Sequence, residues 1–230
     1  MKTAVVLLSG GLDSATVLYM ALKAGFEIDA LSFSYGQKHA PELEAARRTA
    51  ERAGVRNHIE IPLDPVLFRG SSLTGTGDVP DGRAHGRSET DIPSTYVPAR
   101  NTVFLSMALA YAESTGSRDI FIGVNALDYS GYPDCRPEYV RAFQRMADLA
   151  TRAAVEGRPV KVHAPLLDMT KSQIVKLGME LGVDYSLTHS CYRPDDRGRP
   201  CGRCDACLLR LRGFRENGME DPAVYSKDEG

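Results

Sequence analysis

The apolar run Ala4-Val5-Val6-Leu7-Leu8 continues directly into Ser9-Gly10-Gly11-Leu12-Asp13-Ser14-Ala15-Thr16, and this stretch decides the fold. The run 4–8 predicts a buried strand, and the pattern over 14–24 predicts a helix that Gly25 ends. Between them, Gly10 and Gly11 can adopt positive φ and let backbone N–H groups approach an anion. Because a helix N-terminus adds unpaired donors and partial positive charge, the stretch predicts a phosphate-binding turn.

The side chains of this turn indicate what kind of phosphate site it is. The hydroxyls of Ser9, Ser14 and Thr16 can add donors to phosphate oxygens. The stretch lacks the Gly-Lys-Ser/Thr of a Walker A loop and the G-x-G-x-x-G spacing of a dinucleotide turn. The alternative is a glycine-rich turn that binds nothing, which the hydroxyls and the strand–turn–helix context disfavour.

Strand-like and helical patterns alternate beyond this turn. Strands are predicted at 4–8, 28–33, 57–61, 119–124 and 160–164, and helices at 14–24, 41–53, 102–115, 137–156 and 171–181. Such alternation predicts an α/β protein with a Rossmann-like, doubly wound, parallel five-stranded sheet covered by helices on both faces. We expect one α/β domain over residues 1–185.

Two regions interrupt this regular pattern. Residues 64–98 are rich in Gly, Ser, Thr, Asp and Pro, and an insertion of this length predicts a lid over the substrate. Residues 186–220 form a segment too small for a core of its own, with a short basic helix at about 206–217. Residues 221–230 are expected to be frayed.

Composition limits the classes of function. The chain has 230 residues and a net charge of −2, so it carries no general electrostatic footprint for nucleic acid. Its apolar runs are far shorter than the ~20 residues that span a bilayer, and its beginning does not resemble a signal peptide. We therefore expect a cytoplasmic protein that contacts neither membranes nor nucleic acid directly.

The cysteines indicate a metal site. Of five cysteines, four lie close together, at Cys191, Cys201, Cys204 and Cys207. Four thiolates can enclose one tetrahedral Zn²⁺ with no open position, so the predicted role is structural. A Cys-x2-Cys-x2-Cys run also occurs in iron–sulfur proteins, which leaves an iron–sulfur cluster as the alternative. Cys135 stands apart and is expected to be a small packed residue.

The phosphate turn resembles the pyrophosphate loop of the N-type ATP pyrophosphatases, which cleave ATP between its α and β phosphates. Four more stretches narrow the resemblance: SYGQKH at 34–39, VPARNT at 97–102, GVNALDYSGYPDC at 123–135 and HSCY at 189–192. With the phosphate turn and the four cysteines, they resemble the 7-cyano-7-deazaguanine synthases of queuosine biosynthesis. The resemblance covers residues 2–218, but we recognise no motif at 64–96.

The resemblance implies an ATP-dependent ligase that converts 7-carboxy-7-deazaguanine and ammonia into a nitrile. A carboxylate is a poor electrophile, so transfer of AMP would first make an acyl adenylate that ammonia attacks to give an amide. The amide oxygen would then be activated a second time. Implied with this activity are Mg²⁺, one structural Zn²⁺ per chain and a homodimer.

The expected roles follow from position. The phosphate turn, from Leu8 to Thr16, would bind the β and γ phosphates of ATP. Main-chain groups of Leu31, Ser32 and Phe33 would bind the adenine. Asp13, Arg100 and Lys171 are the candidate catalytic residues, with Asp13 either a helix cap or a Mg²⁺ ligand. Deazaguanine would bind to a loop at a strand end, formed by Asp128, Tyr129, Ser130, Gly131, Tyr132 and Asp134. Asp128 or Asp134 would accept hydrogen bonds from the base.

Three other functions compete with this hypothesis. A tRNA thiolase uses the same adenylation, but thiolases need catalytic cysteines near the phosphate turn or a redox cluster, and an RNA-binding surface. Residues 9–16 have no cysteine nearby in sequence, and the chain is slightly acidic. A related enzyme could attach the activated deazaguanine to a protein. A zinc-stabilised module could bind nucleotide without turnover, although the complete phosphate turn argues against it.

Overall fold

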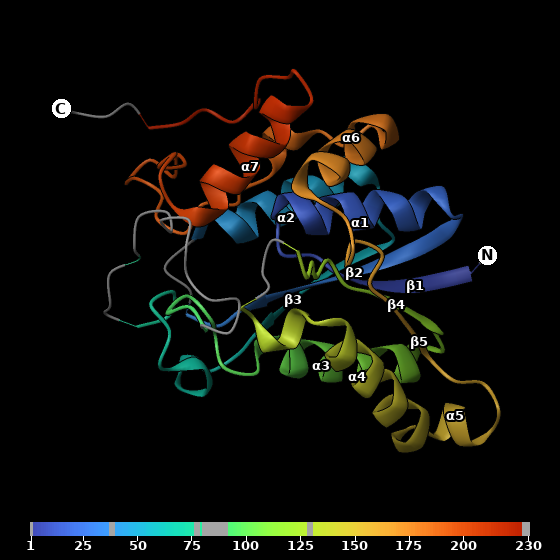
Figure 1. Ribbon diagram of the computed structural model, residues 1–230. Helices are drawn as coiled ribbons and strands as arrows, with labels where there is room; N and C mark the ends of the chain where they lie inside the picture. Colours follow the sequence, from blue (N-terminus) through green and yellow to red (C-terminus); the bar gives the residue numbers. More distant parts are fainter. Residues whose placement is uncertain (1, 37–39, 76–78, 80–91, 128–130, 227–230) are drawn as a thin grey trace.

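The computed structural model describes residues 2–36, 40–75, 79, 92–127 and 131–226. Its centre is a parallel five-stranded sheet in the order β3-β2-β1-β4-β5, which confirms the predicted doubly wound architecture (Figure 1). The strands are β1 (Lys2–Leu7), β2 (Phe26–Ser34), β3 (Asn57–Pro62), β4 (Asp119–Phe121) and β5 (Lys161–His163).

Helices cover both faces of this sheet. The α-helices are α1 (Leu12–Lys23), α2 (Ala40–Ala53), α3 (Arg100–Thr115), α4 (Pro137–Ala150), α5 (Arg152–Val155), α6 (Lys171–Leu181) and α7 (Asp205–Glu216). In Figure 1, α1, α2, α6 and α7 lie on one side of the sheet and α3, α4 and α5 on the other. Short 3-10 turns are η1 (Pro65–Phe68), η2 (Pro133–Cys135) and η3 (Tyr185–Leu187). No helix in the described part of the chain has the length and apolarity to cross a membrane.

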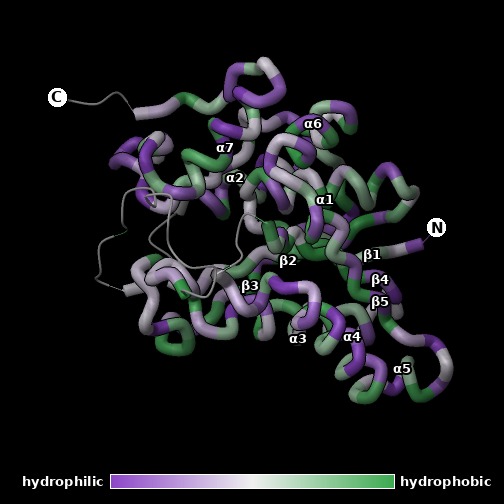
Figure 2. Tube along the Cα trace, viewed as in Figure 1, coloured by the Kyte–Doolittle hydropathy of each residue, from purple (hydrophilic) through white to green (hydrophobic). Residues whose placement is uncertain are grey.

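The first strand shows how the sequence builds two cores. Val5 packs into the cluster beneath α3 and α4, whereas Ala4 and Val6 pack into the cluster beneath α1 and α6. This alternation follows from the two-residue period of a strand. Each fully buried Val or Leu contributes roughly 1.5–3 kcal/mol relative to exposure. Hydrophobic segments accordingly gather around β1 and β2 at the centre of the molecule (Figure 2).

The helix ends match the sequence signals, with one exception. Gly25, Gly54 and Gly182 have φ of 83°, 66° and 81°, as expected for glycines after a helix. The single helix predicted over 137–156 is wrong, because the chain breaks at Thr151 (φ −113°, ψ 143°). The Thr151 hydroxyl accepts a hydrogen bond from the Ala154 N–H, so it caps a separate short helix.

The described part of the insertion contributes to the core. Phe68, Leu73, Val79 and Val97 are buried in the cluster that contains Val5. Residues 76–78 and 80–91, over which the predicted lid would extend, lie outside the described residues. The insertion is thus anchored at both of its ends.

The end of the chain packs onto the domain, in contrast to the expected frayed tail. The side chain of Asp221 is buried and forms a two-point ion pair with Arg210 of α7, at 2.7 and 2.9 Å. Further on, the Ser226 N–H donates to the Pro200 carbonyl at 2.9 Å. Only residues 227–230 of the predicted tail lie outside the described part. A buried carboxylate with an arginine partner is tertiary structure, which composition alone did not reveal.

Candidate active site

A pocket opens at the carboxyl ends of β1 and β4, where the strand order reverses. Ligands of open α/β sheets bind at this point, because the loops there diverge to opposite faces. The phosphate turn, both ends of the insertion, the start of α3, the loop after β4 and the first residues of the cysteine segment all line the pocket. Segments far apart in sequence thus meet at the predicted edge of the sheet.

The phosphate turn depends on one glycine. Gly10 has φ of 84°, whereas Gly11 is extended with φ of −80°, so only the first glycine uses the conformational freedom expected of both. A Cβ on Gly10 would lie 2.1 Å from the Glu42 carbonyl oxygen and 2.8 Å from the Ala46 nitrogen. Gly10 therefore lets the first turns of α2 pack against the loop. The N-cap residue of α1, Gly11, makes no side-chain cap hydrogen bond, so N–H groups of the first helical turn remain for a ligand.

The hydroxyls of the turn have different surroundings. Ser9 and Ser14 line the pocket, and their Oγ atoms lie 3.0 Å apart. Thr16 is fully buried, and its hydroxyl bonds to the Leu12 carbonyl and to the Tyr185 hydroxyl. The expectation that Thr16 contacts phosphate is therefore wrong, because α1 turns this side chain toward α6. Gly10 and Ala15 likewise support the turn, and they are not among the described residues that line the pocket.

Asp13 and Lys171 form the charged centre of the pocket. The Lys171 Nζ donates to both carboxylate oxygens of Asp13, at 2.6 and 2.8 Å, and only 7% of Lys171 is exposed. Gly11 is the N-cap of α1, so the alternative in which Asp13 caps the helix does not hold. The close packing of Gly213 on Lys171 places α7 behind this lysine.

The start of the cysteine segment braces the phosphate turn. The His189 N–H donates to the Gly10 carbonyl at 2.9 Å, and the Leu12 N–H donates to the Ser190 hydroxyl at 3.4 Å. Both His189 and Ser190 also line the pocket. The cysteine segment and the phosphate turn are thus one connected structure.

The proposed adenine strand contributes two side chains to the pocket. Leu31 and Phe33 line it, and Phe33 stacks on Phe104 with ring centroids 4.1 Å apart. Ser32 points to the opposite face, where its hydroxyl donates to the Leu8 carbonyl at 2.5 Å. Ser32 therefore supports the neighbouring strand with its side chain, and Leu8 itself lines the pocket.

Arg100 and Asp134 approach each other from α3 and η2. The Asp134 carboxylate accepts the Asn101 N–H at 3.1 Å, and the Arg100 guanidinium donates to the Tyr35 hydroxyl at 3.2 Å. Burial raises the pKa of Asp134, and the Asn101 N–H and the Arg100 charge oppose that rise. The turn into α3 requires Ala99 at φ of 51°, a strained value for a residue with a Cβ.

The deazaguanine loop is described only in part. Asp128, Tyr129 and Ser130 lie outside the described residues. Gly131 is buried, and it is not among the described residues that line the pocket. Tyr132 and Asp134 do line the pocket. Of the two candidate carboxylates, Asp134 is the one that the structure places there.

Cys135 lies in the same pocket as Asp13, although the two are far apart in sequence. The argument against a thiolase from sequence distance alone is therefore weaker than expected. Burial and the nearby Asp134 raise the pKa of Cys135 to about 12. The Cys135 side chain is therefore a protonated thiol at neutral pH. Because the thiolate is the nucleophilic form, Cys135 is a packed residue and not a nucleophile, as expected.

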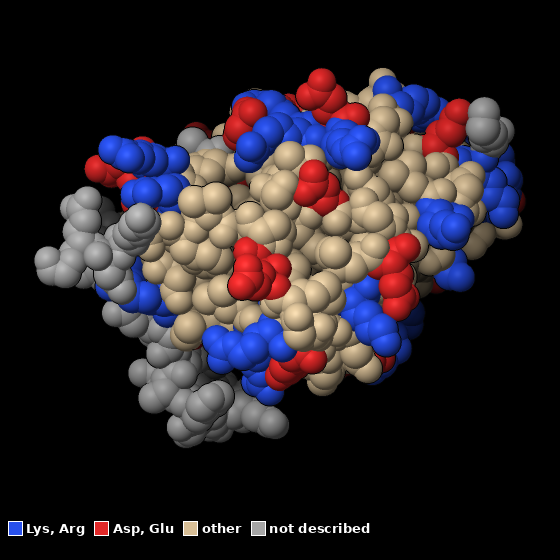
Figure 3. All heavy atoms as spheres, turned by 90° about the horizontal axis from the view of Figure 1, so that it is seen from above, with Lys and Arg blue, Asp and Glu red and all other residues tan. Residues whose placement is uncertain are grey.

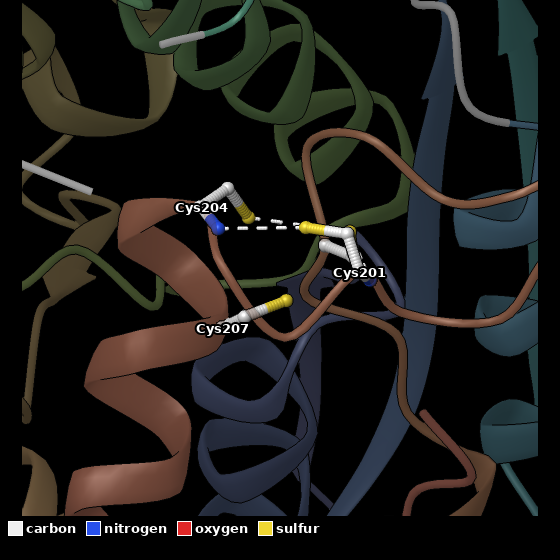
Figure 4. A group of neighbouring side chains, drawn as sticks. Cys201, Cys204 and Cys207 are labelled. Atoms are coloured by element: carbon white, nitrogen blue, oxygen red, sulfur yellow. Dashed lines mark hydrogen bonds between the residues drawn. The ribbon is translucent and has the colours of Figure 1, made fainter. Parts of the chain in front are cut away.

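The four clustered cysteines form a donor set for one metal ion. Their sulfur atoms all lie within 4.8 Å of one another, and all four residues are buried. Figure 4 shows Cys201, Cys204 and Cys207 pointing toward one another. Backbone N–H groups of Arg193 and Cys201 both donate to the Cys191 sulfur at 3.2 Å, which stabilises a thiolate. The donors fit a closed four-sulfur site.

Some residues of the pocket received no role from the sequence. Tyr35, Asn101, Asn125, His189, Ser190 and Tyr192 line it, and all lie in the four motif stretches. Residues 37–39 of the first motif lie outside the described part. Glu42, in the first turn of α2, also lines the pocket, and no sequence signal marked it.

The face formed by α6 and α7 agrees with the low net charge. Figure 3 shows acidic and basic side chains interspersed on it, without a continuous basic patch. The arginines near the cysteines pair locally, since Arg199 binds Asp195 and Arg212 binds Glu216, each at 2.6 Å.

The sheet order and the pocket at its switch point define a doubly wound α/β protein with its pocket at the carboxyl ends of β1 and β4. An NMN synthetase from Francisella tularensis has a similar fold, with a TM-score of 0.51 and 17% identity over 95% of this chain and 78% of that one. The model of the family described as queuosine biosynthesis protein QueC matches residues 3–218. The chain belongs to this family.

Curated relatives match over nearly the whole length. A 7-cyano-7-deazaguanine synthase of Kineococcus radiotolerans is 61% identical over 97% of this chain and 98% of its own. Another, of Desulfatibacillum aliphaticivorans, is 60% identical over 97% of both chains. These relatives and the family support a ligase of queuosine biosynthesis, and they do not favour a thiolase.

Proposed function

We propose that this chain converts 7-carboxy-7-deazaguanine and ammonia into 7-cyano-7-deazaguanine at the expense of ATP. One observation carries the proposal: a phosphate turn, the Asp13–Lys171 pair and the buried Asp134 line a single pocket. A nucleotide and a base-like acceptor would therefore meet in it. The names of the relatives give 7-cyano-7-deazaguanine as the product, which supports its 7-carboxy counterpart as the acceptor.

The reaction begins with activation of the substrate carboxylate. Attack of a carboxylate oxygen on the α phosphorus of ATP forms an acyl adenylate and releases pyrophosphate. The N–H groups at the start of α1 and the hydroxyls of Ser9 and Ser14 would hold the leaving pyrophosphate. Lys171 and Arg100 would stabilise the charge that builds on the phosphates. Ammonia then displaces AMP to form the amide, and a second adenylation of the amide oxygen precedes loss of AMP to the nitrile.

Recognition of the base is assigned to the η2 side of the pocket. Asp134 keeps carboxylate acceptor capacity beyond its bond to Asn101, so it would accept from the N1–H and 2-amino edge of deazaguanine. Tyr132, held by a 2.6 Å bond between its hydroxyl and that of Thr95, would contact the ring face. Asp128, Tyr129, Ser130 and Gly131 are retained as candidates for the same loop.

Two metals belong to the proposal. Mg²⁺ bound by Asp13 and the ATP phosphates would neutralise charge on the leaving pyrophosphate. Zn²⁺ would be held by Cys191, Cys201, Cys204 and Cys207, because four buried sulfurs, the first three of which accept backbone N–H bonds, match a closed structural site. An iron–sulfur cluster is the alternative, and its visible absorption distinguishes it.

We further propose a cytoplasmic homodimer. Clustered thiols require a reducing compartment to remain metal ligands, which supports the cytoplasm. Leu149 and Val155 on α4 and α5 are 83% and 79% exposed, which supports a covered apolar face there. Light scattering of the purified protein checks the dimer.

The test is incubation with ATP, Mg²⁺, ammonium and 7-carboxy-7-deazaguanine, followed by mass spectrometry. We expect the nitrile, AMP and pyrophosphate, and an amide intermediate at early times. Asp134→Asn should weaken binding of the deazaguanine while ATP binding persists. Absence of both nitrile and AMP in the complete mixture would refute the proposal. Transfer of deazaguanine to a protein would instead support the related enzyme named above.

A further inference from the structure

Glu42 is a pocket carboxylate without a role in the proposed adenylation. It lies in the first turn of α2, is partly buried and lines the same pocket as Asp13 and Asp134. The close approach of α2 to Gly10 fixes its backbone against the phosphate turn. Its position is therefore set by the same packing that shapes the turn.

The three pocket carboxylates differ in their partners. Asp13 is paired with Lys171, and Asp134 accepts the Asn101 N–H. None of the described residues forms a hydrogen bond or ion pair with the carboxylate of Glu42. Burial raises its pKa to about 7, and the charge of Arg100 limits that rise. Two ionisable groups of the described residues, Arg100 and Tyr35, lie beside Glu42. Each of the two affects the pKa of the other.

The reaction requires uncharged ammonia as its nucleophile, and the residues assigned to adenylation do not provide it. Ammonia exists in neutral water mainly as ammonium, which has no lone pair and cannot attack an acyl adenylate. Lys171 and Arg100 are cations and repel ammonium. A carboxylate attracts ammonium, and a general base works best when its pKa lies near the working pH.

We propose that Glu42 binds ammonium in the pocket and removes its proton to form the nucleophile. The inference rests on the proposed function, because it assigns the nitrogen half of that reaction. Three observations carry it: Glu42 lines the pocket, its carboxylate forms no hydrogen bond or ion pair with a described residue, and Asp13 and Asp134 are already engaged by such bonds.

The proton balance is as follows. Ammonium gives one proton to the Glu42 carboxylate and becomes ammonia. The nitrogen lone pair forms a C–N bond to the acyl carbon, the carbonyl re-forms, and the C–O bond to AMP breaks with its electron pair on the AMP phosphate. The nitrogen then loses one more proton to water, giving a neutral amide. Glu42 returns its proton to water before the next turnover.

The test compares two nucleophiles with Glu42→Gln. Hydroxylamine is uncharged at neutral pH, attacks acyl adenylates and needs no base to become a nucleophile. We expect the variant to lose about 100-fold in amide and nitrile formation from ammonium, a typical contribution of a general base. Hydroxamate formation from hydroxylamine, ATP and 7-carboxy-7-deazaguanine should stay near the wild-type rate. The matched control is Glu44→Gln, because Glu44 is exposed on the same helix and pairs with Arg47.

Each outcome bears on the inference. An equal loss with both nucleophiles would overturn it, since the defect would then lie in adenylation. A raised Mg²⁺ requirement for AMP release, with ammonium use unchanged, would also overturn it and make Glu42 a metal ligand. The wild-type rate with ammonium should rise through pH 7, and that inflection should disappear in Glu42→Gln. If wild-type protein forms neither AMP nor hydroxamate, the proposed function fails instead.

Discussion

Replacement of Asp221 by asparagine should destabilise the protein strongly. The side chains of Arg210 and Asp221 are 3% and 1% exposed, and they form a two-point ion pair. The Asn side chain keeps the shape but leaves a buried guanidinium without its counter-charge. Breaking a buried pair in this way costs about 3–5 kcal/mol of the free energy of unfolding. At about 2–4 °C per kcal/mol for a chain of this size, Tm should fall by about 6–20 °C.

Helix α7 supplies the matched control for this prediction. Arg212 and Glu216 form an ion pair at 2.6 Å, close to the 2.7 Å between Arg210 and Asp221, but their side chains are 65% and 43% exposed. Glu216→Gln should therefore cost only about 0–1 kcal/mol. The assay is thermal unfolding monitored by circular dichroism at pH 7. If the two variants lose equal stability, residue 221 is not held in the core and the reasoning is refuted.

The stability that the Arg210–Asp221 pair contributes depends on pH through the pKa of Asp221. Burial alone would raise the pKa of Asp221, but the hydrogen bond and charge of Arg210 together with the bonds from Tyr225 and Ala223 outweigh it, and the pKa is lowered. A lowered folded-state pKa contributes stability that is fully present above the unfolded value and is lost as the pH falls through the folded value. The difference in Tm between wild type and Asp221→Asn should narrow below about pH 4. A difference that stays constant down to pH 3 would contradict the ionic origin.

Three further changes test the pocket and the metal segment. Gly10→Ala should weaken ATP binding measured by calorimetry, because its Cβ would lie 2.1 Å from the Glu42 carbonyl oxygen; unchanged affinity would refute the role of this packing. Cys204→Ser should lower bound zinc, measured by elemental analysis, and lower Tm as well; a full metal content would exclude Cys204 as a ligand. Lys171→Met should leave Asp13 without its 2.6 Å partner and slow AMP formation, whereas Lys176→Met, on the same helix, should not. Equal rates in the two lysine variants would remove Lys171 from the site.

The strands and most helices could be predicted from the sequence, because each carries its own local period. The edge at which Asp13, Arg100 and Asp134 meet also followed, since parallel strands place their carboxyl ends together. The helix break at Thr151 was missed because a threonine hydroxyl can bond within a continuing helix or cap a new one. Only the extended backbone there decides between the two.

Side-chain direction was the harder problem within the site. Thr16 and Ser32 belong to stretches that build the pocket, yet each points to the opposite side of its element. Asp221 was expected in a frayed tail, and no sequence signal marked Arg210 as its partner. Glu42 carried no motif at all. These assignments depend on packing between distant segments, which no local pattern records.

The contacts between the phosphate turn and the end of the chain set an order of assembly. The turn is made within the first 16 residues, but its braces are Lys171, His189 and Ser190. On the ribosome, a chain that has grown only through the sheet still lacks these three contacts. A nascent or truncated protein therefore contains the complete glycine turn and still presents an unfinished pocket. The phosphate turn is among the first segments to be synthesised and among the last to reach its functional conformation.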